Sequence, residues 1–123
     1  MDTNDIPQQL QDKIARFQQL SQQLQVVSAQ LQQVQQQRTE VDSAKEAMDG
    51  LEKGAAVYKS AGAIMIQVKD VDALKADLVE RSEELEVKVK SYSKHEESLK
   101  KTVDDLRNEL TVALGQGPAG GMS

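Results

Sequence analysis

Side chains that commonly carry catalysis or bind metals are scarce in this chain. His95 is its only histidine and there is no cysteine, so a zinc site is not expected and a thiol nucleophile is excluded. Glu83, Glu84 and Glu86 stand just before two lysines. At helical spacing, such neighbouring opposite charges are typical of a solvated helix face rather than of a catalytic pair of carboxylates. We therefore predict that the protein is not an enzyme and that His95 is a surface residue.

Binding of phosphates, nucleic acids or membranes is not indicated either. The glycines at 115, 117, 120 and 121 follow the last expected helix, and no Lys-Ser or Lys-Thr pair comes after them, so they do not form a phosphate-binding loop. The chain has 15 Lys and Arg against 20 Asp and Glu, whereas nucleic-acid binding needs an excess of clustered cations. No apolar run approaches the roughly 18 residues of a membrane span. We therefore expect no cofactor, nucleic acid or membrane as partner. Residues 1–5 include two aspartates and lack the basic and then apolar pattern of a signal peptide, which favours a cytoplasmic location.

The composition favours long helices over a compact globule. The chain has one Phe, two Tyr and no Trp, whereas a compact domain of this size usually buries several aromatic rings. It is rich in Gln, Glu, Lys, Leu and Ala, as long helices are. A length of 123 residues leaves room for one domain at most. We therefore predict a single, mainly α domain that spans residues 1–123.

The first predicted element is a helix over residues 7–52. Pro7 suits a first helical turn, and Gly50 and Gly54 are expected to end the helix. Its apolar residues follow a spacing of three and four that is typical of a coiled coil. They form two rows: Leu10, Phe17, Leu24 and Leu31, and Leu20, Val27, Val34, Val41 and Met48.

Glutamine dominates the first part of this helix, with 14 of the 30 residues from 8 to 37. The alternative is therefore a disordered, aggregation-prone glutamine tract. Glutamine is a good helix former and the apolar spacing is regular, which favours the helix. The glutamines are then a polar outer face that carries little charge.

The second predicted helix covers residues 70–114. Asp70 is its expected N-cap, Asp72 complements the helix dipole, and Gly115 ends it. In one row, an apolar or aromatic residue recurs at every seventh position without a gap. The residues of a second row are polar at first and become apolar toward the C-terminus. The rows are Val71, Leu78, Leu85, Tyr92, Leu99, Leu106 and Ala113, and Lys75, Ser82, Val89, Glu96, Val103 and Leu110.

The two helices can pair as an antiparallel coiled coil in one register. Because the first helix ends near 52 and the second begins near 71, the numbers of paired residues should add up to about 123. This register leaves no layer polar on both sides, since each charged seam residue faces an apolar one and its long stem can cover that neighbour. Representative pairs are Phe17 with Leu106, Leu24 with Leu99, Val41 with Ser82, and Arg38 with Leu85.

A β-hairpin is predicted between the helices, over residues 55–69. Ile64, Ile66 and Val68 alternate with Met65, Gln67 and Lys69, as in a strand. Val57 and Tyr58 suit the preceding strand, and Gly62 supplies a positive φ for the turn. The alternative is an irregular loop, but antiparallel helices are usually joined by far fewer residues. Two strands alone are marginal in water, so we predict an obligate oligomer with a shared β body.

The segments around the hairpin carry a family resemblance. Val57-Tyr58-Lys59-Ser60-Ala61-Gly62, followed by Ile64-Met65-Ile66-Gln67-Val68-Lys69-Asp70, closely resembles the prefoldin β-type subunit of archaea, and so does the glutamine-rich start Pro7-Gln8-Gln9-Leu10-Gln11. A tail rich in Gly, Pro and Met over residues 115–123, which we expect to be disordered, is similar too. The resemblance covers nearly the whole chain, and its specific part is the hairpin segment.

The resemblance implies a long antiparallel coiled-coil hairpin whose central β-hairpin oligomerises into a β-barrel body. Four such chains would join two α-type subunits in a hexamer from which six coiled coils project. The assembly would be an ATP-independent chaperone that captures unfolded or nascent proteins and delivers them to a group II chaperonin. The alternative function is a structural coiled-coil tether or adaptor without client binding, although a tether needs no β-rich hub.

Two sets of residues are the candidate sites. Equal helix lengths are expected to bring both chain ends together at the tip away from the β body, where partly exposed apolar side chains favour binding. The expected client contacts at this tip are Ile6, Leu10, Ile14, Leu110 and Leu114. The expected assembly residues of the hairpin are Val57, Tyr58, Ile64, Ile66 and Val68.

Overall fold

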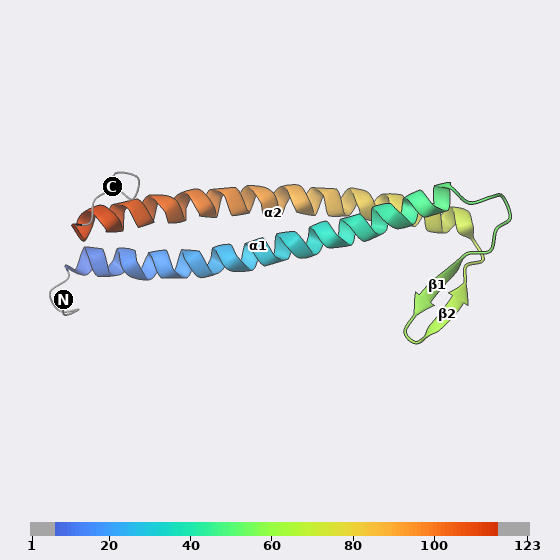
Figure 1. Ribbon diagram of the computed structural model, residues 1–123, viewed down its shortest axis with the longest axis horizontal. Coiled ribbons are helices and arrows are strands. Elements are labelled where there is room, and N and C mark those ends of the chain that lie inside the picture. The colour runs from blue at the N-terminus through green and yellow to red at the C-terminus, as the bar shows by residue number, and fades with distance from the viewer. Residues whose placement is uncertain (1–6, 116–123) are drawn as a thin grey trace. The chain divides into compact units, whose positions relative to one another are not determined.

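The computed structural model describes residues 7–115 of the chain and contains two long helices with a hairpin between them in sequence (Figure 1). The order is α1 (Gln8–Asp49), β1 (Tyr58–Ala61), β2 (Ile64–Gln67) and α2 (Val71–Ala113). The mainly helical class with a two-stranded antiparallel hairpin is therefore confirmed. The expected tail lies outside the described residues from position 116 on, as does Ile6.

The chain divides into two compact units through which both helices run. Unit 1 contains the described residues up to Leu31 and from Ser91 on, and unit 2 contains Gln32–Lys90. Each unit therefore has one segment of α1 paired with one segment of α2, and the hairpin belongs to unit 2. In unit 1, the first turns of α1 lie beside the last turns of α2 (Figure 1).

Helix α1 ends three residues before the expected position 52. Leu51 N–H donates to the carbonyl of Met48, only three residues back, at 3.2 Å, and Ala55 N–H does the same to Glu52 at 3.1 Å. These tight turns replace the bonds to the fourth preceding residue that would continue an α-helix. Gly54 then takes a φ of +85°, which only glycine adopts readily.

Helix α2 begins and ends as its capping residues predict. The Asp70 carboxylate accepts a hydrogen bond from Ala73 N–H at 2.9 Å, the geometry of an N-cap. At the other end, Gly115 has a φ of +79° and donates its N–H to the carbonyl of Val112. The helix is therefore bounded at Val71 and Ala113 by local chemistry at both ends.

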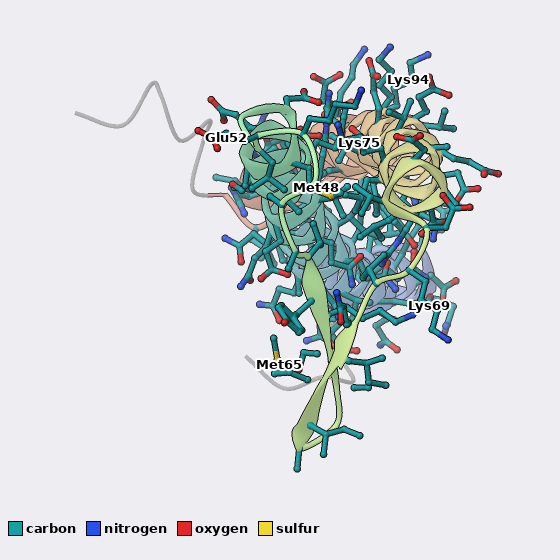
Figure 2. The ribbon with its side chains drawn as sticks, turned by 90° about the vertical axis from the view of Figure 1, so that its right-hand side faces the viewer. Met48, Glu52, Met65, Lys69, Lys75 and Lys94 are labelled. Carbon is teal, nitrogen blue, oxygen red and sulfur yellow. The ribbon has the colours of Figure 1, made fainter. Side chains whose placement is uncertain are left out.

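The buried residues of each unit come from the rows of seam residues predicted for the two helices. In unit 1 the buried side chains are Val27, Leu31, Leu99, Val103, Leu106 and Leu110, and in unit 2 they are Val34, Val41, Met48, Leu78, Leu85 and the polar Ser82. Figure 2 shows Met48 between the helices of unit 2. The core is thus a narrow seam along each helix pair.

Polar contacts between the helices confirm the predicted register. In unit 1, Lys13 pairs with Glu109 at 3.5 Å, and the Arg107 guanidinium lies 5.8 Å from the centre of the Phe17 ring. In unit 2, Arg38 approaches Glu86 at 3.9 Å. The residue numbers of these pairs add up to 122 or 124, one on either side of the expected 123.

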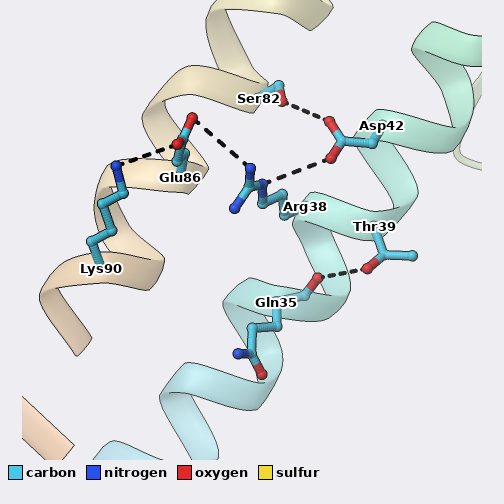
Figure 3. A network of polar contacts seen from close by, with 7 residues as sticks. All are labelled: Gln35, Arg38, Thr39, Asp42, Ser82, Glu86 and Lys90. Atoms are coloured by element: carbon cyan, nitrogen blue, oxygen red, sulfur yellow. Dashed lines mark hydrogen bonds and ion pairs between the residues drawn. The ribbon is translucent and has the colours of Figure 1, made fainter. Parts of the chain in front are cut away.

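A polar network links the two helices of unit 2 (Figure 3). Ser82 Oγ, the buried polar group among the described residues, donates to Asp42 Oδ1 at 2.6 Å. Arg38 lies between the helices, 3.7 Å from the other Asp42 oxygen and 3.9 Å from Glu86, which also pairs with Lys90 at 3.4 Å. A charge-assisted hydrogen bond is stronger than a neutral one, whereas exposed ion pairs contribute little. The Ser82–Asp42 bond is therefore the main polar tie of this unit.

The hairpin turns through two residues, Gly62 and Ala63. Gly62 has a φ of +64°, and no other residue of the turn has a positive φ. A positive φ at the first central position is the pattern of a type II′ turn, whose twist matches that of the strands. The predicted role of Gly62 is confirmed.

Candidate functional site

The strand register divides the hairpin into two faces. Directly opposed residues of antiparallel strands share a face, and the register pairs Lys59 with Ile66 and Ala61 with Ile64. Val68 N–H donates to the Val57 carbonyl at 2.8 Å, which continues the same ladder. Four of the five predicted assembly residues therefore lie on one surface, which we call the Ile/Val face: Val57, Ile64, Ile66 and Val68.

The fifth residue, Tyr58, lies on the opposite face. Tyr58 pairs with Gln67, and Ser60 pairs with Met65, so Tyr58 and Met65 share this second surface, which we call the Tyr/Met face. Met65 was absent from the predicted site residues. The alternation of residues 64–69 separates Met65 from the isoleucines, but only the register of both strands places it with Tyr58.

Both faces expose large apolar side chains. Tyr58, Ile64, Met65 and Ile66 are all exposed, and Val57 and Val68, at the base of the hairpin, are half-buried. Figure 2 shows the hairpin projecting from the helices of its unit, with Met65 on it. Two strands with exposed apolar faces and open edges offer a template for further strands. The hairpin is therefore suited to contact with other chains.

Unit 1 contains the described residues among the expected client contacts. They lie at the paired helix ends, by which we mean residues 10–14 of α1 and residues 110–114 at the end of α2 and just beyond it. Leu10 and Ile14 are half-buried, Leu114 is 46% exposed, and Leu110 is only 8% exposed. Leu110 thus closes the seam, and contact with another molecule would need the seam to open. Val112, outside the predicted set, is exposed as well. This surface offers apolar contact.

Residues 7–115 present neither a metal cluster nor a membrane-spanning helix. In this part of the chain, no three residues of the types His, Cys, Asp or Glu are grouped so that they could hold a metal ion. Neither of the two described helices has a stretch that is long and apolar enough to cross a bilayer. The candidate sites are the exposed apolar surfaces of the hairpin and of the paired helix ends.

Comparison with known proteins gives one consistent family. Residues 11–117 match the family described as Prefoldin subunit. The prefoldin subunit beta of Methanocella arvoryzae is 47% identical over 122 residues, with 96% of each chain covered. That of Pyrobaculum neutrophilum is 38% identical over 112 residues, which cover 90% of this chain and 87% of the relative.

A solved structure has the same fold. The crystal structure of the prefoldin beta subunit from Thermococcus strain KS-1 superposes with a TM-score of 0.76 at 32% sequence identity, covering 89% of this chain and 96% of the other. The similarity therefore includes the helices and the hairpin that forms the distinctive part of the sequence. The chain belongs to the prefoldin subunit family, a family of chaperone subunits that assemble with one another, and its relatives are archaeal β subunits.

Proposed function

We propose that this chain is a cytoplasmic, ATP-independent chaperone subunit that binds unfolded or nascent proteins at its paired helix ends. It prevents their aggregation and delivers them to a group II chaperonin. Its assembly partners are an α-type prefoldin subunit and further copies of itself, with two α-type and four β-type chains in a hexamer. Membership of the prefoldin family supports the chaperone role and the association with other prefoldin subunits.

The observation that carries this proposal is the exposure of apolar side chains at the paired helix ends. Val112 on the last turn of α2 and Leu114 just after the helix are exposed, and Leu10 and Ile14 on α1 are only half-buried. Contiguous exposed apolar surface on a protein marks a place where another molecule binds. An unfolded chain presents apolar side chains without a fixed shape, so such a surface can bind it without a matched pocket.

Assembly would raise the affinity of these weak contacts. Each chain contributes one such surface, and an oligomer held together by the hairpins would present several of them to one unfolded chain. When one surface has bound, the others act at a high effective concentration, so the overall affinity exceeds that of any single contact. The hairpin and the paired helix ends therefore have complementary roles in holding a client.

Truncation provides the first test of this proposal. Removal of residues 1–10 and 111–123 should leave the mass of the assembly unchanged and abolish the delay of aggregation of a chemically unfolded protein without ATP. Unchanged suppression of aggregation would refute the assignment of the client site.

A pair of point variants gives a sharper comparison. Val112 and Val26 are both 56% exposed and both lie in unit 1, but Val26 is outside the paired helix ends. The double variant Val112→Gln, Leu114→Gln should weaken suppression of aggregation, and Val26→Gln should preserve it. Equal losses in both proteins would show that general surface polarity, rather than the helix ends, matters.

A further inference from the structure

A lysine stands in the middle of the Ile/Val face of the hairpin. Lys59 is paired directly with Ile66 in the register of the two strands, so both side chains lie on this face. Val57 and Val68 continue the face on one side of this pair, and Ile64 continues it on the other side. The apolar surface that is expected to mediate assembly therefore carries a positive charge near its centre.

Lys59 has no counter-charge within the described part of its own chain. Its side chain is exposed and forms no ion pair with any residue from 7 to 115. Asp70 and Asp77 line the same hollow beside α2 as Lys59, but neither pairs with it. The Asp70 carboxylate accepts a hydrogen bond from Ala73 N–H as the cap of α2. In the single chain, the Lys59 ammonium group is therefore left to the solvent.

Assembly through the Ile/Val face would make this charge costly. A chain seated on the isoleucines on either side of Lys59 in sequence space would also remove water from the lysine, and a charged group that loses water without a counter-charge is strongly disfavoured. A carboxylate opposite the lysine would offset this cost through a charge-assisted hydrogen bond. The face therefore fits a partner that combines apolar side chains with an acidic residue.

A second copy of this chain offers no such residue in its hairpin. The segment from 53 to 69 contains three lysines, Lys53, Lys59 and Lys69, and no Asp or Glu. The chain as a whole is acidic, with 20 Asp and Glu against 15 Lys and Arg, so the hairpin is a basic segment of an acidic protein. Contact between two such hairpins would bring like charges together, which disfavours the pairing.

We propose that Lys59 selects the chain that covers the Ile/Val face, and that this chain is an α-type prefoldin subunit whose contact strand places a carboxylate opposite the lysine. The inference rests on the proposed assembly through the hairpin and adds the charge that the partner must carry. The apolar residues of the face attract any strand of suitable shape. Lys59 discriminates between such strands, because an unpaired buried charge disfavours those that lack an acidic residue.

The substitution Lys59→Met tests this pairing by the direction of its effect. Methionine keeps a flexible apolar side chain and removes the charge. With a carboxylate opposite, the substitution leaves that carboxylate unpaired and should raise the dissociation constant for the α-type subunit by roughly 10- to 150-fold, the loss expected for a hydrogen bond between charged groups. Without such a carboxylate, removal of the charge from an apolar contact would leave the dissociation constant unchanged or lower it.

Two further variants support this measurement. Lys59→Glu places a negative charge opposite the carboxylate and should weaken binding of the α-type subunit more than Lys59→Met does. Lys94→Met is the matched control, because Lys94 is also exposed but lies on α2 in unit 1. This control should leave the dissociation constant unchanged. Circular dichroism should report the same helix content for all three variants, since each changes an exposed side chain.

Self-association of the chain alone distinguishes the possible partners. Weaker binding of the α-type subunit by Lys59→Met, without weaker self-association, supports the inference. Weakening of both by the same factor would show that a second copy supplies the carboxylate, which overturns the choice of partner. Unchanged or tighter binding of the α-type subunit overturns the role of Lys59 and leaves the proposed function standing. If the unchanged chain does not bind the α-type subunit at all, both the inference and the proposed assembly fail.

Discussion

The assembly role of the Ile/Val face leads to a prediction whose size follows from exposure. Ile64 is 62% exposed and Ile66 is 41% exposed, so an interface that covers both would bury the equivalent of about one complete isoleucine side chain. Full burial of such a side chain is worth about 1.5–3 kcal/mol. Since about 1.4 kcal/mol corresponds to a factor of ten, loss of this term should raise the dissociation constant of each hairpin contact by roughly 10- to 150-fold.

The double variant Ile64→Asp, Ile66→Asp removes this burial and places two carboxylates in the contact. A buried, unpaired carboxylate adds a further cost, so the estimate above is a lower limit. We expect monomers or dimers in sedimentation and native mass measurements, at concentrations where the unchanged chain and its α-type partner form the hexamer. Circular dichroism should still report the two helices, because neither isoleucine lies in them.

Val79→Asp, Val87→Asp is the matched control for this experiment. These valines are 43% and 67% exposed, lie on α2 of the same unit and are outside the hairpin. Valine and aspartate have similar helix propensities, so the control adds the same charge without loss of apolar contact in the hairpin. A normal hexamer from the isoleucine variant, or equal dissociation of both variants, would refute the argument from the Ile/Val face.

Three further predictions concern the folded chain itself. Leu106→Ala should lower the free energy of unfolding by about 2–5 kcal/mol in denaturant titrations, because Leu106 is buried in the seam. Leu114→Ala, at an exposed position, should change this free energy by less than about 0.5 kcal/mol. Equal effects of the two substitutions would contradict the burial pattern. Ser82→Ala should lower the same free energy by about 0.5–1.5 kcal/mol through loss of the bond to Asp42, and no change would show that this bond is not a net stabiliser. Gly62→Ala places a Cβ at a φ of +64° and should destabilise the hairpin by about 1–2 kcal/mol, measured by amide hydrogen exchange. Gly50→Ala should not destabilise the hairpin, because Gly50 has an ordinary φ and an added Cβ would meet only contacts of 3.7 Å or more. A similar loss of protection in both variants would count against the turn assignment.

Much of the fold could be predicted from the sequence because its causes are local. The seven-residue repeat brings one side chain after another to the same helix face, so the rows from Leu10 to Met48 and from Val71 to Ala113 specify both helices and their register. Capping is local in the same way: Asp70 and Gly115 act within one turn of the ends of α2. Gly62 similarly marks the turn because only glycine adopts its φ at little cost.

The tertiary structure decided how the candidate surfaces are divided and which of their residues are accessible. Tyr58 and Ile64 belong to different faces because the pairing between strands, rather than the composition of either strand, sets the face. Leu110 is buried and Leu114 is exposed although they are only four residues apart, since burial depends on what the other helix places opposite each residue.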